Sequence, residues 1–307
     1  MAVYPLAAGL TSHSGTLTPE IWTGKTLVKF YKKTVFGEIC NTDYEGEIKA
    51  QGDTVHIRNI PDITISDHAI DQELNYERPA TTVTDLLIDK GKSYSFSVNK
   101  IEEVQSDLNY VEKWTTDAGE QLAISIDTAI LADVYSDANS SNAGASAGAV
   151  SGAFDLGATG APESVDKTNI LDYIVDMGSC LTEQNVPESG RWIVLPAVFC
   201  GMIKKGELKD ASLAGDSESI MRNGRLGRID DFMIYKSNSI ATSTDGVWTV
   251  HNIIFGHPTA ITFASQLVDH ETLKNPKTFG DLVRGLQVYG YRVVKPEALG
   301  HFYAIVG

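Results

Sequence analysis

The most regular pattern of hydrophobic positions lies between Asn109 and Tyr135. Apolar residues recur there at steps of three and four, the spacing of one face of an α-helix, at Val111, Trp114, Ala118, Leu122, Ile126, Ala129 and Val134. A continuous helix over this range would be about 40 Å long at 1.5 Å per residue, longer than most helices in globular proteins. The pattern therefore predicts a long amphipathic helix that crosses a whole domain.

The chain before this helix, from Gly52 to Val98, has the texture of short β-strands. The strand-like runs are TVHIRNI, DITI, TTVTDLLI and SYSFSV, and Pro61, Pro79 and the predicted turn Lys90-Gly91-Lys92 interrupt them. Between the runs, the stretch Ser66–Arg78 is acidic and holds only Ile70, Leu74 and Tyr76 as large apolar residues. We expect a long loop there, and loops of this length tend to be functional or mobile.

The second half of the chain alternates between helical and strand-like patterns. A helix is predicted from a cap at Thr168 to just before Pro187, followed by the buried strand RWIVLP and the short helix AVFCGMIKKG. Strands are predicted in DFMIYKS, GVWTVHNIIFG, AITFASQLV and the C-terminal LQVYGYRVVKPEALGHFYAIVG. Residues 137–165, rich in Ser, Gly and Ala, are expected to form a flexible surface excursion, and residues 207–230 a long loop. The fold class is therefore α+β.

A basic helix is predicted near the N-terminus. Thr18 and Pro19 have the pattern of a helix start, and Gly37 that of a helix end. Its lysines gather on one side, at Lys25, Lys29, Lys32 and Lys33. Two interpretations stay open: a solvated lysine face, or a clamp that binds an acidic neighbour or turns toward nucleic acid.

Charge and cysteine content narrow the class of partner. The 307 residues include 40 acidic and 25 basic ones, a net charge of −15, which disfavours binding to nucleic acid through its phosphates. Cys40, Cys180 and Cys200 are widely spaced and predict neither a disulfide framework nor a zinc site. The N-terminus lacks the pattern of a secretory signal, and no apolar run approaches the roughly 20 residues of a membrane helix.

We find no catalytic motif in the sequence. The nucleophile elbow, the phosphate-binding loop, the zinc-protease motif and the dinucleotide fingerprint are all absent. The closest histidines, His251 and His257, lie six residues apart, which is weak spacing for metal ligands. We therefore predict no catalytic, cofactor or metal site, although a hydrolase with an unrecognised site stays open as an alternative.

Four stretches, in this order, resemble the Hong Kong 97-type capsid family of tailed bacteriophages. SYSFSVNKIEEVQSD, followed by a helix containing LAISIDTAIL, is similar to the family's strand, acidic linker and spine helix, with Gln105 and Asp127 at the familiar places. VPESGRWIVLPAVFCGMIKKG, with Pro187, Gly190, Arg191 and Pro196, resembles a passage of the axial domain. NGRLGRIDDFMIYKSNSI resembles the return strand that ends at Ser237 and Asn238, and VYGYRVVKPEALGHFYA resembles the closing strands of the peripheral domain.

The resemblance implies a domain organisation. Residues 1–50 would be the N-terminal arm, 51–92 the extended loop, 93–136 with 256–307 the peripheral domain with its long spine helix, and 137–255 the axial domain. The tip of the extended loop would lie across an adjacent subunit. The implied interface residues are Asp67, Asp71, Glu73, Tyr76, Glu77 and Arg78.

The resemblance also implies a function and partners. The chain would be a major capsid protein, not an enzyme, that forms pentamers and hexamers of an icosahedral head shell around the phage genome. It would assemble in the host cytoplasm and stay in the virion. A separate scaffolding protein, a portal and a decoration protein are the implied partners, with packaged double-stranded DNA nearby only non-specifically and no membrane or cofactor. An encapsulin-like nanocompartment shell is the main alternative.

Overall fold

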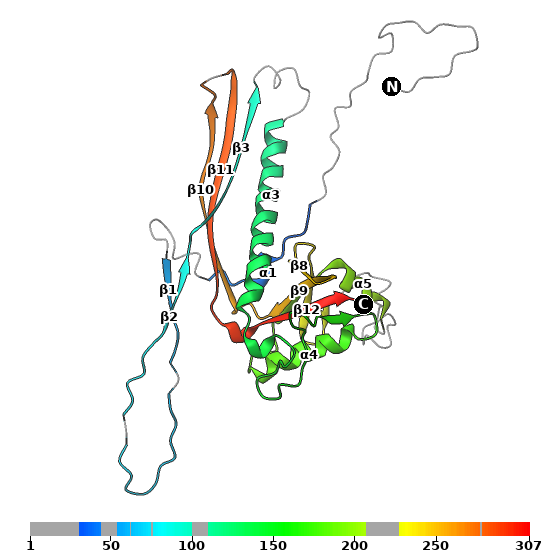
Figure 1. Cartoon of the computed structure of the whole chain (residues 1–307). Coiled ribbons are helices and arrows are strands. Elements are labelled where there is room, and N and C mark those ends of the chain that lie inside the picture. Colours follow the sequence, from blue (N-terminus) through cyan, green and yellow to red (C-terminus); the bar gives the residue numbers. More distant parts are fainter. Residues whose placement is uncertain are drawn as a thin grey trace, which may run out of the picture.

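Three β-sheets and one long helix organise the described part of the chain. The computed structural model describes residues 31–43, 54–61, 63–74, 76–99, 110–206, 227–276 and 278–307. Figure 1 shows a long sheet running beside helix α3, a second body of sheet and short helices at one end of that helix, and a loop that extends away from both. Among the described residues, no helix is long and apolar enough to cross a membrane.

The predicted long helix is confirmed as α3 (Tyr110–Asp133), which continues into a 3₁₀ turn over Val134–Asp137. Its C-terminal half enters the core, because Ile126, Ile130 and Leu131 are almost fully buried. Trp114, in the N-terminal half, keeps 42% of its surface exposed. The predicted face residue Val111 has a side chain outside the described part. The helix is thus anchored at one end and lies on the long sheet with the other.

The long sheet is antiparallel, with strand order β10-β11-β3. It consists of β3 (Lys90–Asn99), β10 (Ile261–Lys274) and β11 (Gly280–Val293). Phe96 of β3 pairs with Val283 of β11 and packs edge-on against Trp114 of α3, with ring centroids 5.7 Å apart. The alternation of Tyr94, Phe96 and Val98 with serines therefore places the large side chains toward the helix. The predicted turn Lys90-Gly91-Lys92 is wrong, because all three residues pair with β11.

A two-stranded sheet, β1 (Thr54–Arg58) with β2 (Val83–Leu87), forms the base of the extending loop. Both strands were predicted. The strand predicted in DITI is wrong for the part that the structure describes, since residues 63–65 are irregular and Ile65 is 90% exposed. Apolar alternation does not make a strand without a partner to bond and a core to face.

The seven-stranded sheet builds the second body. Its order is β4-β12-β9-β5-β7-β6, and β8 pairs with β9. The strands are β4 (Glu163–Val165), β5 (Trp192–Leu195), β6 (Arg228–Ile229), β7 (Phe232–Lys236), β8 (Thr242–Asp245), β9 (Trp248–Gly256) and β12 (Leu299–Val306). All four residues of β5 are buried, as its apolar run predicts. Helices α4 (Ile170–Glu183) and α5 (Ala197–Lys205) contribute buried residues to the same core. Within the predicted loop 207–230, residues 207–226 lie outside the described part, and β6 adds a short strand.

The expected flexible excursion at 137–165 is wrong. Ala147 and Leu156 are fully buried, and β4 pairs in parallel with β12. Gly157 has a φ of +75°, and a Cβ there would lie 2.2 Å from the carbonyl oxygen of Tyr303. The small residues therefore allow the backbone to pack directly on β12. The sequence analysis had interpreted their low apolar content as a sign of an unpacked loop.

The predicted N-terminal helix falls mostly outside the described residues, and its described end is different. Residues 31–35 are not helical, and α1 spans only Phe36–Ile39, beginning just before the predicted stop at Gly37. The backbone N–H groups of Val35 and Phe36 both donate to Asp127 of α3, at 2.9 and 3.0 Å. A carboxylate from another element thus determines where this helix begins.

Candidate assembly surface

The loop between β1 and β2 exposes an unusual amount of apolar surface. Ile70 and Tyr76, which the sequence singled out, are 96% and 86% exposed, and Leu74 is 65% exposed. Ile60, Ile63 and Ile65, which the sequence analysis assigned to strands, are exposed as well. Large exposed apolar patches on a soluble chain mark interaction surfaces. The sequence signal for this surface was the series of isoleucines directly before the acidic stretch 66–78, which the sequence analysis assigned to strands instead.

Local hydrogen bonds shape the loop tip. The Gln72 N–H donates to the Ala69 carbonyl at 3.1 Å, and the Ala69 N–H donates to the Gln72 side chain at 2.8 Å. Asp71 adopts a φ of +62°, in the left-handed region where Asp and Asn are enriched. Farther along, the Thr64 N–H donates to Glu77 across the loop at 3.4 Å. The described tip therefore has a defined turn without contact with the core.

The six predicted interface residues all lie on this loop and are exposed: Asp67, Asp71, Glu73, Tyr76, Glu77 and Arg78. Four are carboxylates and one is a guanidinium, so the loop is acidic as well as apolar. Such a surface fits a partner that offers apolar area with basic groups around it.

The base of the loop is fixed to the body. Ile57, Leu86 and Ile88 form a small buried cluster with Ala264 of β10. A Cβ on Gly290 of β11 would lie 2.0 Å from the Leu87 carbonyl oxygen, so β2 rests directly on the long sheet. The loop is therefore anchored at its base and exposed along its arms.

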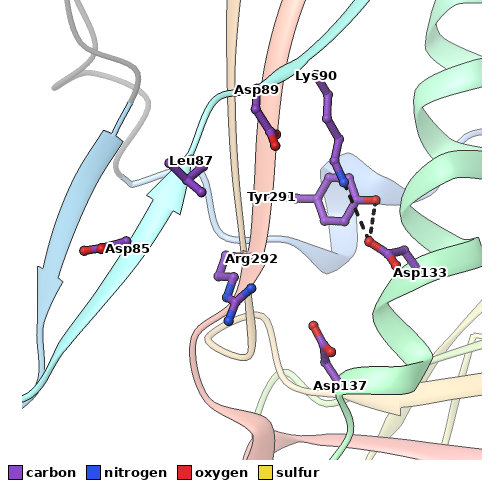
Figure 2. A pocket seen from close by; sticks show the side chains of 8 residues that line it. All are labelled: Asp85, Leu87, Asp89, Lys90, Asp133, Asp137, Tyr291 and Arg292. Atoms are coloured by element: carbon purple, nitrogen blue, oxygen red, sulfur yellow. Dashed lines mark hydrogen bonds and ion pairs between the residues drawn. The ribbon is translucent and has the colours of Figure 1, made fainter.

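A charged pocket of about 130 Å³ lies at the elbow where β2 leads into β3 (Figure 2). Asp133 of α3 accepts a hydrogen bond from the Tyr291 hydroxyl at 2.9 Å and lies 3.7 Å from the Lys90 ammonium. Burial, together with the carboxylate of Asp133, raises the pKa of Tyr291, so its hydroxyl stays a donor at neutral pH. Asp89, Asp137 and Arg292 also line the pocket. The cluster fastens the elbow to α3.

The predicted basic residues are only partly visible. Lys32 and Lys33 are exposed in the segment before α1, whereas Lys25 and Lys29, like Gln105 of the resemblance, lie outside the described residues. The predicted lysine cluster therefore lies partly outside the described residues and stays a prediction.

Arg191 and His301, two polar side chains of the second body, have hydrogen-bond partners. The Arg191 guanidinium donates to the backbone carbonyls of Gly178, Val186 and Pro187 at 2.7–3.0 Å, which ties the segment after α4 to that helix. His301 contacts the side-chain oxygen of Asn252 at 3.1 Å, and burial lowers the pKa of His301 to about 4. Among the described residues, no group of His, Cys, Asp or Glu could hold a metal ion. Cys40, Cys180 and Cys200 are buried and free.

Comparison with known proteins agrees with this geometry. The model of the family described as phage capsid protein matches residues 82–306. A solved structure from Mycobacterium phage Che8 has 29% identity and a TM-score of 0.76, covering 94% of this chain and 97% of that one. The cyanophage P-SCSP1u capsid has 15% identity and a TM-score of 0.69, covering 97% and 98%. The mature capsid of bacteriophage PhiM1 has 16% identity and a TM-score of 0.66, covering 97% of both chains. No curated protein matches the sequence.

The family match covers most of the chain, and the similar solved structures come from phages. These findings confirm the Hong Kong 97-type fold and favour a phage shell over the nanocompartment alternative. The chain therefore belongs to the phage capsid protein family, as a tailed-phage major capsid protein that forms the shell.

Proposed function

We propose that the chain assembles into pentamers and hexamers of an icosahedral head, and that the loop over residues 59–82 joins neighbouring subunits. The observation that carries this proposal is the apolar surface of a loop whose base is buried. Each isoleucine or leucine that becomes buried contributes about 1.5–3 kcal/mol. Five such exposed residues and Tyr76 on one loop offer far more to an assembly than to the folded subunit.

The carboxylates of the loop would determine which neighbour it meets. Asp67, Asp71, Glu73 and Glu77 lie between the apolar residues and are exposed. Charge complementarity across an interface sets register and partner choice more than it sets affinity. We therefore assign the apolar residues to the strength of the contact and the carboxylates, with Arg78, to its specificity.

We further propose the domain division that the resemblance implies. Residues 1–50 form the N-terminal arm, 51–92 the extended loop, 93–136 with 256–307 the peripheral domain, and 137–255 the axial domain. The separate sheets support this division, since β3, β10 and β11 form one sheet and most remaining strands form another. Strand β12, near the C-terminus, pairs with β9 and so connects the peripheral domain to the axial sheet.

We also propose that the subunit assembles in the host cytoplasm around a separate scaffold. It then stays in the virion, together with a portal and a decoration protein, and has no enzymatic role. The net charge of −15 supports an inner wall that repels packaged DNA and binds it only non-specifically. Residual DNA binding should come from Lys25, Lys29, Lys32 and Lys33. Nanomolar, sequence-selective binding at physiological salt in a fluorescence titration would contradict this.

Replacing residues 66–78 with a short Gly-Ser turn tests the loop. We expect near-native circular dichroism and thermal melting, because the loop buries little, together with a loss of shells in electron micrographs. A second variant with the four carboxylates changed to amides keeps the length and the apolar residues, and isolates the role of charge. Normal shells from the shortened variant would exclude the assembly role, and an unfolded subunit would show that the loop belongs to the core.

A further inference from the structure

Residues 31–41, here called the strap, contact three separate parts of the subunit. The Tyr31 hydroxyl donates to Asp117 of α3 at 2.8 Å. At the other end, the Asn41 N–H donates to the Ile261 carbonyl at 2.8 Å, and the Phe263 N–H donates to the Asn41 carbonyl at 2.9 Å. Between them, the Tyr235 hydroxyl of β7 donates to Glu38 at 3.4 Å. One short segment therefore links the spine helix, the long sheet and the seven-stranded sheet.

Asp127 is the buried centre of these contacts. It lies on α3, is fully buried, and accepts the N–H groups of Val35 and Phe36 with a single carboxylate oxygen. Asp127 is more than 90 positions away from Val35 and from Phe36 in the sequence. Hydrogen bonds to a charged acceptor are about twice as strong as neutral ones. Two other side-chain contacts of the strap, Tyr31 with Asp117 and Glu38 with Tyr235, are exposed, whereas the carboxylate of Asp127 is fully buried.

The surroundings of Asp127 disfavour its charged form, and only one of its two oxygens is hydrogen-bonded within the described part of the chain. Its second oxygen, Oδ2, is buried with no hydrogen-bond partner among the described residues. Burial raises the pKa of Asp127, while the two backbone donors and the Lys32 charge lower it. The Cys40 thiol is buried nearby, and burial with the Asp127 charge raises its pKa to about 12, so the thiol stays neutral. A half-satisfied buried carboxylate is unfavourable for folding alone.

We propose that Asp127 is a positioning residue for assembly: it fixes the strap on α3, and the strap holds the long sheet and the seven-stranded sheet at one angle. The second part rests on the proposed function, because that angle matters for the curvature of a shell. A subunit without the anchor still has its core contacts, including Phe36 against Phe263 at 5.1 Å. It lacks the hydrogen bonds that give the strap a single position.

Hydrogen exchange resolved to single amides tests the anchor on the free subunit. In the wild type, the amides of Val35 and Phe36 should exchange at least about tenfold more slowly than that of Lys33. Asp127→Ala should remove this difference, whereas Asp127→Asn, which keeps an acceptor oxygen, should preserve most of it. Asp117→Ala, which removes the exposed contact to Tyr31, is the matched control and should leave both amides protected.

Electron microscopy of assembled particles tests the consequence. Asp127→Ala should give fewer closed shells with a broader range of diameters, and Asp127→Asn should restore the wild-type distribution. Unprotected Val35 and Phe36 amides in the wild type would overturn the anchor without any variant. Deprotected amides with unchanged shells in Asp127→Ala would overturn the link to curvature. If the wild type forms no shells, the proposed function fails, but the exchange experiment still decides on the anchor.

Discussion

The ammonium group of Lys90 lies 4.0 Å from the centroid of the Tyr291 ring. Lys90 is the first residue of β3, and Tyr291 lies near the end of β11, beside α3 (Figure 2). A cation over an aromatic face contributes about 0.5–1 kcal/mol at a partly exposed site. The contact therefore helps to fix the direction in which the chain turns from the loop base into the long sheet.

Tyr291→Phe separates the hydroxyl from the ring in this cluster. The change removes the hydrogen bond to Asp133 at 2.9 Å and keeps the face that Lys90 covers. We expect the free energy of unfolding to fall by about 0.5–1.5 kcal/mol in urea titrations. Tyr76→Phe, on the exposed loop, is the control and should change nothing measurable. Equal effects in both variants would mean that the hydroxyl of Tyr291 has no specific role.

Two isoleucines close together in sequence should behave in opposite ways. Ile57→Ala removes a buried side chain of the loop base and should cost about 2–5 kcal/mol of unfolding free energy. Ile63→Ala, at 67% exposure, should cost less than about 0.5 kcal/mol and yet reduce shell formation. Urea unfolding and sedimentation of the two variants give the comparison. A large loss of stability in Ile63→Ala would show that the loop packs on its own subunit.

Arg191→Lys should be severely destabilising although it preserves charge. The guanidinium is fully buried and serves several backbone carbonyls at once, which an ammonium cannot reach together. Leaving buried acceptors unpaired should cost about 3 kcal/mol or more. Arg228→Lys, at a guanidinium that is 56% exposed, should stay within about 0.5 kcal/mol. The melting temperatures of the two variants give the comparison. Equal melting temperatures would show that the buried guanidinium of Arg191 has no special structural role.

His301 gives the subunit a predictable acid sensitivity. Burial lowers the pKa of His301 from 6.5 to about 4, so the unfolded chain binds this proton more readily than the folded one. The contribution of neutral His301 is therefore present above pH 6.5 and is lost as the pH falls from about 6.5 to about 4. His301→Gln cannot titrate, and its unfolding free energy should vary less with pH over this window. Identical pH profiles for both proteins would contradict the buried neutral imidazole.

The sequence correctly predicted those helices and strands whose spacing of apolar residues matches the side that packs against other elements in the structure. The alternation around Phe96 and the three-and-four spacing around Ile126 match faces that are partly buried in the long sheet and fully buried at the C-terminal end of α3. Ile63 and Ile65 failed as a strand because no described strand pairs with them and both side chains are exposed. The proposed contact with a neighbouring subunit would supply the surface that this apolar pattern lacks within the described residues.

The remaining failures came from contacts between residues distant in sequence. The sequence near Val35 does not indicate that its N–H will donate to Asp127, because the two residues meet only after α3 has packed. Gly157 looked like part of a flexible stretch, because its use depends on the backbone of Tyr303 far along the chain. The six interface residues were placed on an exposed loop by their order and composition, but their contacts with a neighbour stay a prediction.

The pairing of β3 with β11 has a consequence for synthesis on the ribosome. Asn99 bonds across to Gly280, so β3 leaves the exit tunnel roughly 180 residues before its partner. At about 5–20 residues per second, the nascent chain carries Tyr94 and Phe96 uncovered by this strand for roughly 10–40 seconds. Many chains made at once on neighbouring ribosomes would therefore present the same unpaired strand to one another. We expect the yield of assembly-competent subunits to depend on chaperones and to rise when translation is initiated less often, because fewer incomplete chains are then present at once.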